Sequence, residues 1–354
     1  MTFRLNTIIY SSILVFLIYA THPIVSLAGN WKHRVQAGVE LDNNVTESTH
    51  DPETASSVRL IYQGDVKCSQ KHLNFSSQWS GGYQAYNPLL RENKGVGEYT
   101  LACSYRFNRS WGIGLNNFLR GKAFERKPIR YFVWSASGYS YIQLPAGYQI
   151  IGGFRHHMLD YSGYEIYDFS GNELFAVLFK SFSREWELEF EFDRSKLFYD
   201  RVSYVKNPHN VFGIIGKDPQ TDQIQRLLLT LQHCGAILWK TSCGIEDNQS
   251  NSYSFSYQSM WVTSSFSMRI ARDYIVRLYG MLQRKRYTER FGPDIADELD
   301  SESRNSNFLI FDISRNLSSW QSIFIRVNIY DNESTLRSYY YKKNTITIGS
   351  EFRM

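Results

Sequence analysis

The stretch from Trp186 to Asp193 reads W-E-L-E-F-E-F-D, and it constrains the fold more than any other part of the chain. Large apolar side chains alternate along it with carboxylates. A period of two places neighbouring side chains on opposite faces only in a β-strand. Such a strand needs an apolar medium on one face and water on the other. A soluble sheet provides a core and solvent, whereas a membrane barrel provides lipid outside and a wet lumen inside.

Composition narrows the possible classes of protein. Aromatic side chains make up 16% of the 354 residues, and they suit both strands and the interfaces of a membrane. The mean hydropathy of −0.38 excludes a protein made of membrane-spanning helices. The net charge of +5 comes from both signs scattered along the whole chain, which excludes the clustered Lys and Arg of a nucleic-acid-binding surface.

The first 28 residues have the features of a targeting segment. Arg4 supplies a positive charge, Ile8 to Tyr19 is apolar, and Ser26-Leu27-Ala28 has the small-x-small pattern of a cleavage site. We therefore predict a secretory signal peptide over residues 1–28, cleaved after Ala28. The apolar run is short for a membrane span of about 20 residues, which disfavours an uncleaved anchor.

The rest of the chain, residues 29–354, contains sixteen segments with the alternating pattern of strands. Short turns follow every second segment, and longer polar connections follow the others. Short turns at one end and long loops at the other are typical of outer-membrane barrels. We therefore predict one all-β domain, an antiparallel up-and-down transmembrane β-barrel of about 16 strands, between 14 and 18.

The longest predicted loop runs from about Asp200 to Asp222 and contains Pro208, Pro219 and Gly213. Such a loop either folds into the barrel and narrows it or lies on the outer surface. The surface position is the more common one for loops.

The last ten residues, T-I-T-I-G-S-E-F-R-M, alternate up to Met354. They resemble the terminal strand of bacterial outer-membrane β-barrel proteins, which the barrel-insertion machinery of that membrane recognises. The resemblance implies that Phe352 and Met354 form the insertion signal, although most such proteins end in an aromatic residue. The stretch Gly38 to Val45, G-V-E-L-D-N-N-V, is similar to the first strand of porin-like barrels and of the barrel domain of surface-lipoprotein assembly modifiers. Together they imply a protein of the bacterial outer membrane, exported through the inner membrane.

Charged side chains fall mainly on one parity of the predicted strands. An Arg or Lys that faces lipid costs roughly 2–4 kcal/mol at the middle of the bilayer, so this parity should face the lumen. The predicted lumen-lining residues are Arg34, Glu40, Arg59, Arg106, Arg120, Arg155, Glu187, Glu189, Glu191, Arg277, Arg326 and Glu351. The segment Tyr131 to Leu144 is ambiguous, because aromatic side chains occupy both of its parities.

Several functions are compatible with this pattern. A barrel of about sixteen strands usually encloses a lumen wider than side chains can fill. Opposed Arg and Glu would then set a field across a channel for small hydrophilic solutes, which is the leading hypothesis. The same side chains could instead pair into ladders in a plugged or merely solvated lumen. Two other hypotheses are the barrel component of a surface-polymer or lipoprotein export system, and a structural or adhesive barrel that acts through its extracellular loops.

We expect no catalytic site, no cofactor and no metal. His156 and His157, with Asp160 nearby, are the candidates for a hydrolase at the rim, but the chain has no G-x-S-x-G and no H-E-x-x-H motif. Cys234 and Cys243 could form a disulfide in an oxidising compartment, although their unequal placement about a turn favours free thiols. The expected partners are outer-membrane lipid, the insertion machinery and an unidentified solute or exported polymer, without nucleic acid.

Overall fold

The computed structural model describes residues 30–48, 50–127, 130–162, 167–206, 213–289, 306–332 and 341–354. Within these ranges the chain forms sixteen β-strands and two short 3-10 turns. No helix in the described ranges is long and apolar enough to cross a membrane. The predicted signal peptide, residues 1–28, lies outside the described residues.

The strands follow one another along the chain. They are β1 (Asn30–Asp42), β2 (Ala55–Gln70), β3 (Leu73–Asn87), β4 (Lys94–Arg106), β5 (Trp111–Phe124), β6 (Arg130–Leu144), β7 (Tyr148–Ser162), β8 (Phe169–Ser181), β9 (Trp186–Lys206), β10 (Gly213–Cys234), β11 (Ile237–Ser250), β12 (Tyr257–Arg269), β13 (Tyr274–Tyr287), β14 (Ser306–Asn316), β15 (Gln321–Asn332) and β16 (Tyr341–Arg353). The 3-10 turns are η1 (Leu90–Glu92) before β4 and η2 (Pro145–Gly147) before β7.

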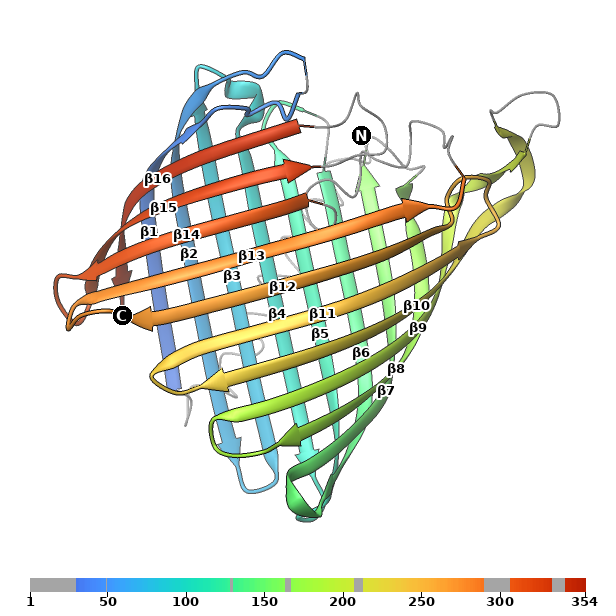
Figure 1. Cartoon of the computed structure of the whole chain (residues 1–354), viewed down its shortest axis with the longest axis horizontal. Coiled ribbons are helices and arrows are strands. Elements are labelled where there is room, and N and C mark those ends of the chain that lie inside the picture. The colour runs from blue at the N-terminus through green and yellow to red at the C-terminus, as the bar shows by residue number, and fades with distance from the viewer. Residues whose placement is uncertain are drawn as a thin grey trace, which may run out of the picture.

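Each strand pairs with the next in antiparallel fashion, and β16 returns to pair with β1, so the sheet closes into a barrel. The closing register runs from Arg34 opposite Arg353 to Asp42 opposite Thr345. In Figure 1 the front strands β11 to β16 cross the rear strands steeply, as the tilt of a closed barrel requires. The predicted antiparallel up-and-down barrel is therefore confirmed.

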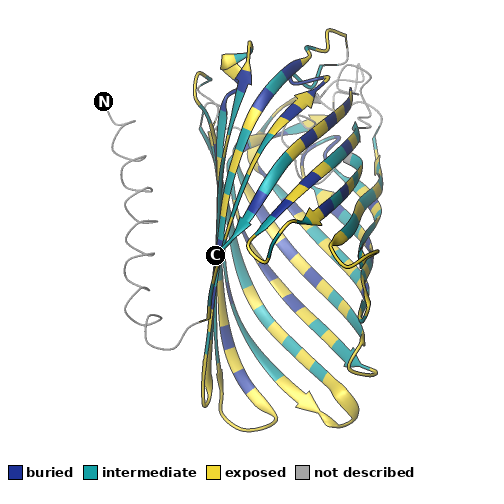
Figure 2. Ribbon diagram, turned by 90° about the vertical axis from the view of Figure 1, so that its left-hand side faces the viewer, coloured by how far each residue is buried: buried dark blue, intermediate teal, exposed yellow. Residues whose placement is uncertain are grey.

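The two faces of the sheet differ in polarity, and burial alternates along the strands (Figure 2). Large outward side chains remain exposed: Leu282 is 71% exposed and Ile348 is 60% exposed. The side chain of Thr347, which precedes Ile348 on β16, is buried on the inner face. A broad apolar outer belt fits the hydrocarbon of a bilayer, whereas in water it would promote association. The barrel is therefore a transmembrane fold.

The segment Tyr131 to Leu144, whose parity was ambiguous, belongs to β6, and the strand register shows which of its side chains face inward. Tyr139 and Tyr141 lie opposite Gly114 and Gly112 of β5, on the inner face. A Cβ at Gly114 or Gly112 would lie 2.2 or 2.4 Å from the tyrosine ring, so the rings occupy the space that the glycines leave. Trp134, of opposite parity, faces outward.

Several short turns are closed by the same kind of hydrogen bond, from the backbone to a side-chain oxygen. Asn108 Oδ1 accepts hydrogen bonds from the backbone N–H groups of Ser110 and Trp111 at 2.8 and 2.9 Å. Ser183 Oγ and Ser318 Oγ accept from the second and third residues after them in the same way. Such side chains satisfy the backbone donors of a tight turn locally, so one strand can end and the next begin within a few residues.

The predicted loop from Asp200 to Asp222 is wrong. β9 continues to Lys206 and β10 begins at Gly213, so most of this segment is a paired hairpin. The two strands have 21 and 22 residues, and the hairpin projects beyond the other strands in Figure 1. Pro219 suggested a loop, but it lies where the register of β10 shifts, and such irregularities accommodate proline in a sheet. The described part of this segment does not fold inward as a constriction.

Gly349 of β16 makes the closing seam a sensitive point. A Cβ there would lie 2.4 Å from the carbonyl oxygen of Ala37 and 2.8 Å from the ring of Phe324. Gly349→Val should therefore destabilise the closed barrel by about 1–3 kcal/mol, the usual cost of overpacking. Urea unfolding in lipid vesicles and a heat-modifiable gel shift measure this change. Ser350→Val, whose side chain faces outward, is the control, and equal behaviour of the two variants would contradict the tight seam.

The assignment of faces on β12 can be tested with two adjacent residues. Val262 faces outward and Thr263 faces inward. Val262→Arg should lower the free energy of unfolding in vesicles by roughly 2–4 kcal/mol, because the charge enters lipid near the middle of the belt. Thr263→Arg should cost much less, since its guanidinium reaches the polar interior. The reverse order of stabilities would show that the faces are assigned wrongly.

Candidate functional site

The inner face of the barrel is the candidate functional site, and it carries every predicted lumen-lining residue. Directly opposed residues of neighbouring strands share a face, so the strand register extends one parity around the barrel. The residues that this register brings to the inner face include Arg34, Glu40, Arg59, Arg106, Arg120, Arg155, Glu187, Glu189, Glu191, Arg277, Arg326 and Glu351. Their role as the lining of an open channel stays a prediction.

The inner face of β13 to β16, β1 and β2 contains the closing strand pair, and we call it the seam wall. Asp312 of β14 is only 3% exposed and lies opposite both Arg277 of β13 and Arg326 of β15. Arg277 Nη1 donates to Asp312 Oδ1 at 2.9 Å, and Arg326 Nε donates to Oδ2 at 3.2 Å. Two guanidinium groups thus share one buried carboxylate, and this row keeps a surplus of positive charge.

Glu40 of β1 is the second buried carboxylate of the seam wall. Thr347 Oγ1 and Gln84 Nε2 each donate to it at 2.7 Å, and Arg59 Nη1 lies 3.5 Å from Oε2. Neutral donors thus make the short contacts with Glu40, and the ion pair with Arg59 is longer. Arg59 is therefore held more weakly by Glu40 than Arg277 and Arg326 are held by Asp312.

Glu351 of β16 is another buried carboxylate of the seam wall, near its short-turn end. Arg353 Nε donates to it at 2.8 Å and Gln36 Nε2 donates at 2.7 Å. Arg34 Nε lies 3.7 Å away, on the far side of the closing pair. Side-chain contacts therefore reinforce the backbone pairing of β1 with β16.

The inner face of β8 to β11 carries many carboxylates, and we call it the acidic wall. Arg226 Nη2 lies 2.5 Å from Asp193 Oδ2 and 3.8 Å from Glu191 Oε1. On β8, Glu173 accepts a hydrogen bond from Arg155 Nη1 of β7 at 2.5 Å. These carboxylates lie toward the long-connection end and are paired with arginine.

Two carboxylates of the acidic wall differ from the others. Within the part of the chain that the structure describes, neither Glu187 nor Glu189 forms an ion pair. The register places Gln232 and Thr230 of β10 opposite them, so their neighbours on that side are neutral. Both are half-buried side chains on consecutive inward positions, about 7 Å apart along the strand. They give this side of the interior a negative potential.

The connection between β1 and β2 packs against the inner face, near the long-connection end of the barrel. Val45 packs with Tyr86 of β3 in a small buried cluster. Glu47 Oε1 and Asp42 Oδ2 each lie 3.1 Å from Nζ of Lys343 on β16. This connection therefore lies against the interior.

The sheet separates the histidine pair. His157 faces inward, with Nε2 3.1 Å from Glu173 Oε2. His156 faces outward, with Nδ1 2.8 Å from Asn172 Oδ1. Asp160 shares the outward parity of His156, so the three side chains do not gather into one site. The described residues also contain no group of three or more His, Cys, Asp or Glu placed to hold a metal ion.

Sequence reasoning missed several partners of the predicted residues. The missed inward residues include Glu98, Glu173, Arg226, Asp312 and Lys343. Asp193 was recognised as continuing the alternation of the three glutamates before it, although it was not named in the predicted lumen-lining set. The others become recognisable as partners only once the register between strands is known.

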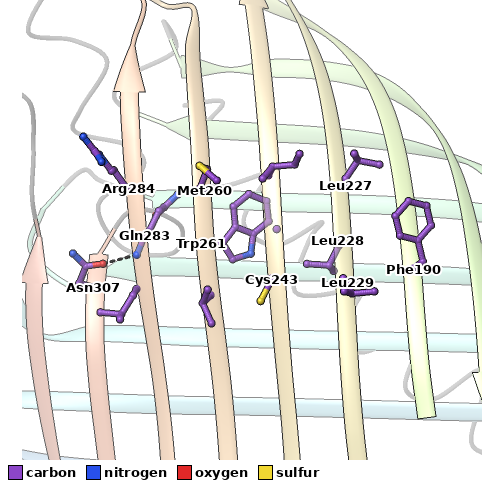
Figure 3. A pocket seen from close by; sticks show the side chains of 14 residues that line it. Phe190, Leu227, Leu228, Leu229, Cys243, Met260, Trp261, Gln283, Arg284 and Asn307 are labelled. Carbon is purple, nitrogen blue, oxygen red and sulfur yellow. Dashed lines mark hydrogen bonds between the residues drawn. The ribbon is translucent and has the colours of Figure 1, made fainter.

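An apolar depression of about 510 Å³ lies on the outer face of β9 to β14 (Figure 3). Phe190, Leu229 and Met260 are among its lining residues, and Arg284 lies at one end of it. Cys243 also lines it and is a free thiol, as is Cys234, which confirms the prediction for this pair. Because Phe190, Leu229, Met260 and most of the other apolar lining residues point outward, the depression belongs to the lipid-facing surface and not to the interior.

No protein-family model matches the chain, and no curated protein matches it. A bacterial polysaccharide outer membrane secretin is 7% identical with a TM-score of 0.44, over 92% of this chain and 98% of that one. OmpT, an outer membrane protein of Vibrio cholerae, is 8% identical with a TM-score of 0.44 over the same shares. The toluene transporter TbuX of Ralstonia pickettii is 9% identical with a TM-score of 0.38, over 92% and 89%. The similarity to assembly modifiers stays a prediction.

Proposed function

We propose that this protein is a channel of the bacterial outer membrane for small hydrophilic solutes. The observation that carries the proposal is the pair of unpaired carboxylates on the acidic wall, Glu187 and Glu189. An ionised group that is buried without a partner is strongly unfavourable, so an interior packed with protein would pair them. Carboxylates without ionic partners fit an interior that contains water.

The charge distribution fits transport of polar solutes. β9 lies halfway round the closed strand order from β1, so Glu187 and Glu189 face the seam wall with its surplus of arginine. Low-dielectric walls focus the field of such opposed charges into the water between them. A solute with a dipole or a charge would orient in that field, and an apolar solute would gain nothing from it.

The proposed location follows from the asymmetry of the two ends. β1 begins and β16 ends at the short-turn end of the barrel, as in outer-membrane barrels. Phe352, the proposed insertion signal with Met354, stacks outward on Trp320 with ring centroids 6.0 Å apart. Outer-membrane lipid and the barrel-insertion machinery are the partners proposed with this location.

The test is single-channel conductance of the refolded protein in a planar bilayer, after a heat-modifiable gel shift has shown that the barrel has formed. We expect stable open-channel steps. The triple variant Glu187→Gln/Glu189→Gln/Glu191→Gln should lower the ratio of cation to anion permeability by about twofold or more, because it removes negative charge from one wall.

The matched control removes three carboxylates that face outward, through Asp160→Asn/Asp247→Asn/Asp331→Asn. Its permeability ratio should equal that of the wild type. A folded barrel without conductance steps would exclude the channel. It would favour an export component that opens only with a partner, or an adhesive barrel that acts through features such as the projecting β9–β10 hairpin.

A further inference from the structure

The seam wall contains a cavity of about 240 Å³ between strands that are far apart in the sequence. Arg277, Asp312 and Arg326 form its floor as one row across β13, β14 and β15. Arg59 enters from β2, on the other side of β16 and β1, so the cavity exists only because the barrel closes. Tyr330 of β15 completes the side nearer the long connections.

The charges that line this cavity do not balance. Among the described residues that line it, three arginines bring guanidinium groups to the cavity and Asp312 is the one carboxylate. That carboxylate is already shared by Arg277 and Arg326. Arg59 has only its 3.5 Å contact with Glu40, whose other contacts at 2.7 Å come from neutral donors. A surplus of positive charge therefore faces the cavity even when Glu40 is counted.

Two of the three guanidinium groups, those of Arg277 and Arg326, are also held in place before any ligand arrives. Arg326 lies over the ring of Phe324, with the guanidinium carbon 5.3 Å from the ring centroid. Phe324 in turn occupies the space left by Gly349, where a Cβ would lie 2.8 Å from the ring. Arg277 is fixed by its contact with Asp312. Donors with fixed positions bind an anion with little loss of conformational entropy.

We propose that this cavity binds small oxyanions, solutes that carry a phosphate or carboxylate group, on their way through the barrel. Guanidinium groups match the planar oxygen pairs of carboxylate and phosphate and bind them through short charge-assisted hydrogen bonds. The volume admits a small solute but not a folded polymer. The proposal rests on the proposed channel function and gives it a substrate class.

The position of the cavity agrees with a site on a passage. Lys343, the neighbour of Tyr330 on β16, is neutralised by Asp42 and Glu47 of the first connection, so it does not compete for the anion. An anion that enters from this end can therefore reach the three arginines without first being held by Lys343.

The test uses inorganic phosphate and the refolded protein, with two separate measurements. Calorimetry in detergent reports binding whether or not the barrel conducts, and planar-bilayer recording reports whether phosphate interrupts the current. Arg59→Gln should weaken phosphate binding at least tenfold. Arg120→Gln is the matched control, because Arg120 is also an inner-face arginine paired with a glutamate, at 38% side-chain exposure against 36% for Arg59. Its affinity for phosphate should stay within twofold of the wild type.

A second variant keeps the proposal testable if Arg59→Gln fails to fold. Asp312→Asn removes the carboxylate that competes for Arg277 and Arg326. It should strengthen phosphate binding several-fold, a gain that general damage to the barrel would not produce. Acetate in place of phosphate compares a carboxylate with a phosphate, and chloride at equal ionic strength measures simple screening.

The outcomes separate the oxyanion site from the channel. Phosphate binding that is lost in Arg59→Gln and kept in Arg120→Gln supports the site even in a barrel that never conducts, and absence of conductance then overturns only the channel. Open steps with no phosphate binding overturn the site and leave the channel. Equal losses in the two arginine variants, or an equal response to chloride, also overturn the site.

Discussion

The pairing of β1 with β16 is the interaction on which the rest of the structure depends. In a bilayer no water is available to the backbone, so every N–H and C=O of a spanning strand needs a partner within the protein. Without this pair the sheet would expose two open edges to lipid. Gly38 and Gly349 lie opposite each other at the seam, and their lack of side chains lets the chain ends and Phe324 pack closely.

Closure also determines how the interior is built. Because the outer face is mainly apolar, most polar side chains of the strands lie on the inner face, and neighbouring strands bring opposite charges within reach. The paired rows on the seam wall and around Asp193 follow from this crowding. Glu187 and Glu189 stand apart, because the strands beside them offer neutral neighbours. Ion pairs therefore link neighbouring strands in some parts of the interior, and other parts are solvated.

The alternation of single strands was enough to predict the fold and the face of each residue in the predicted lumen-lining set. Trp186 to Asp193 alone indicated the two media, and extending its logic assigned the lumen-lining set to the inner face. The predictions that failed concern contacts between neighbouring strands. Tyr139 faces inward because Gly114 of the next strand makes room, and no pattern within β6 records this.

Other errors have a similar origin. Pro219 indicated a loop from its own chemistry, but a shift in register keeps it inside a paired hairpin. The convergence of Arg59 with Arg277 and Arg326 was beyond any reading of single strands, because it needs both the register and the closure of the barrel. Sequence therefore predicts which side chains face inward, and only the pairing of the strands predicts which of them meet.

The sharing of Asp312 by two arginines has an evolutionary consequence. Loss of Arg277 or Arg326 alone leaves the buried carboxylate one cationic partner, whereas loss of both leaves an anion that is 3% exposed without compensation. The cost of the double change should exceed the sum of the single costs. These three positions are thus epistatic: a lineage can neutralise Asp312 first and then drift at both arginines, but the opposite order passes through a poorly folded intermediate.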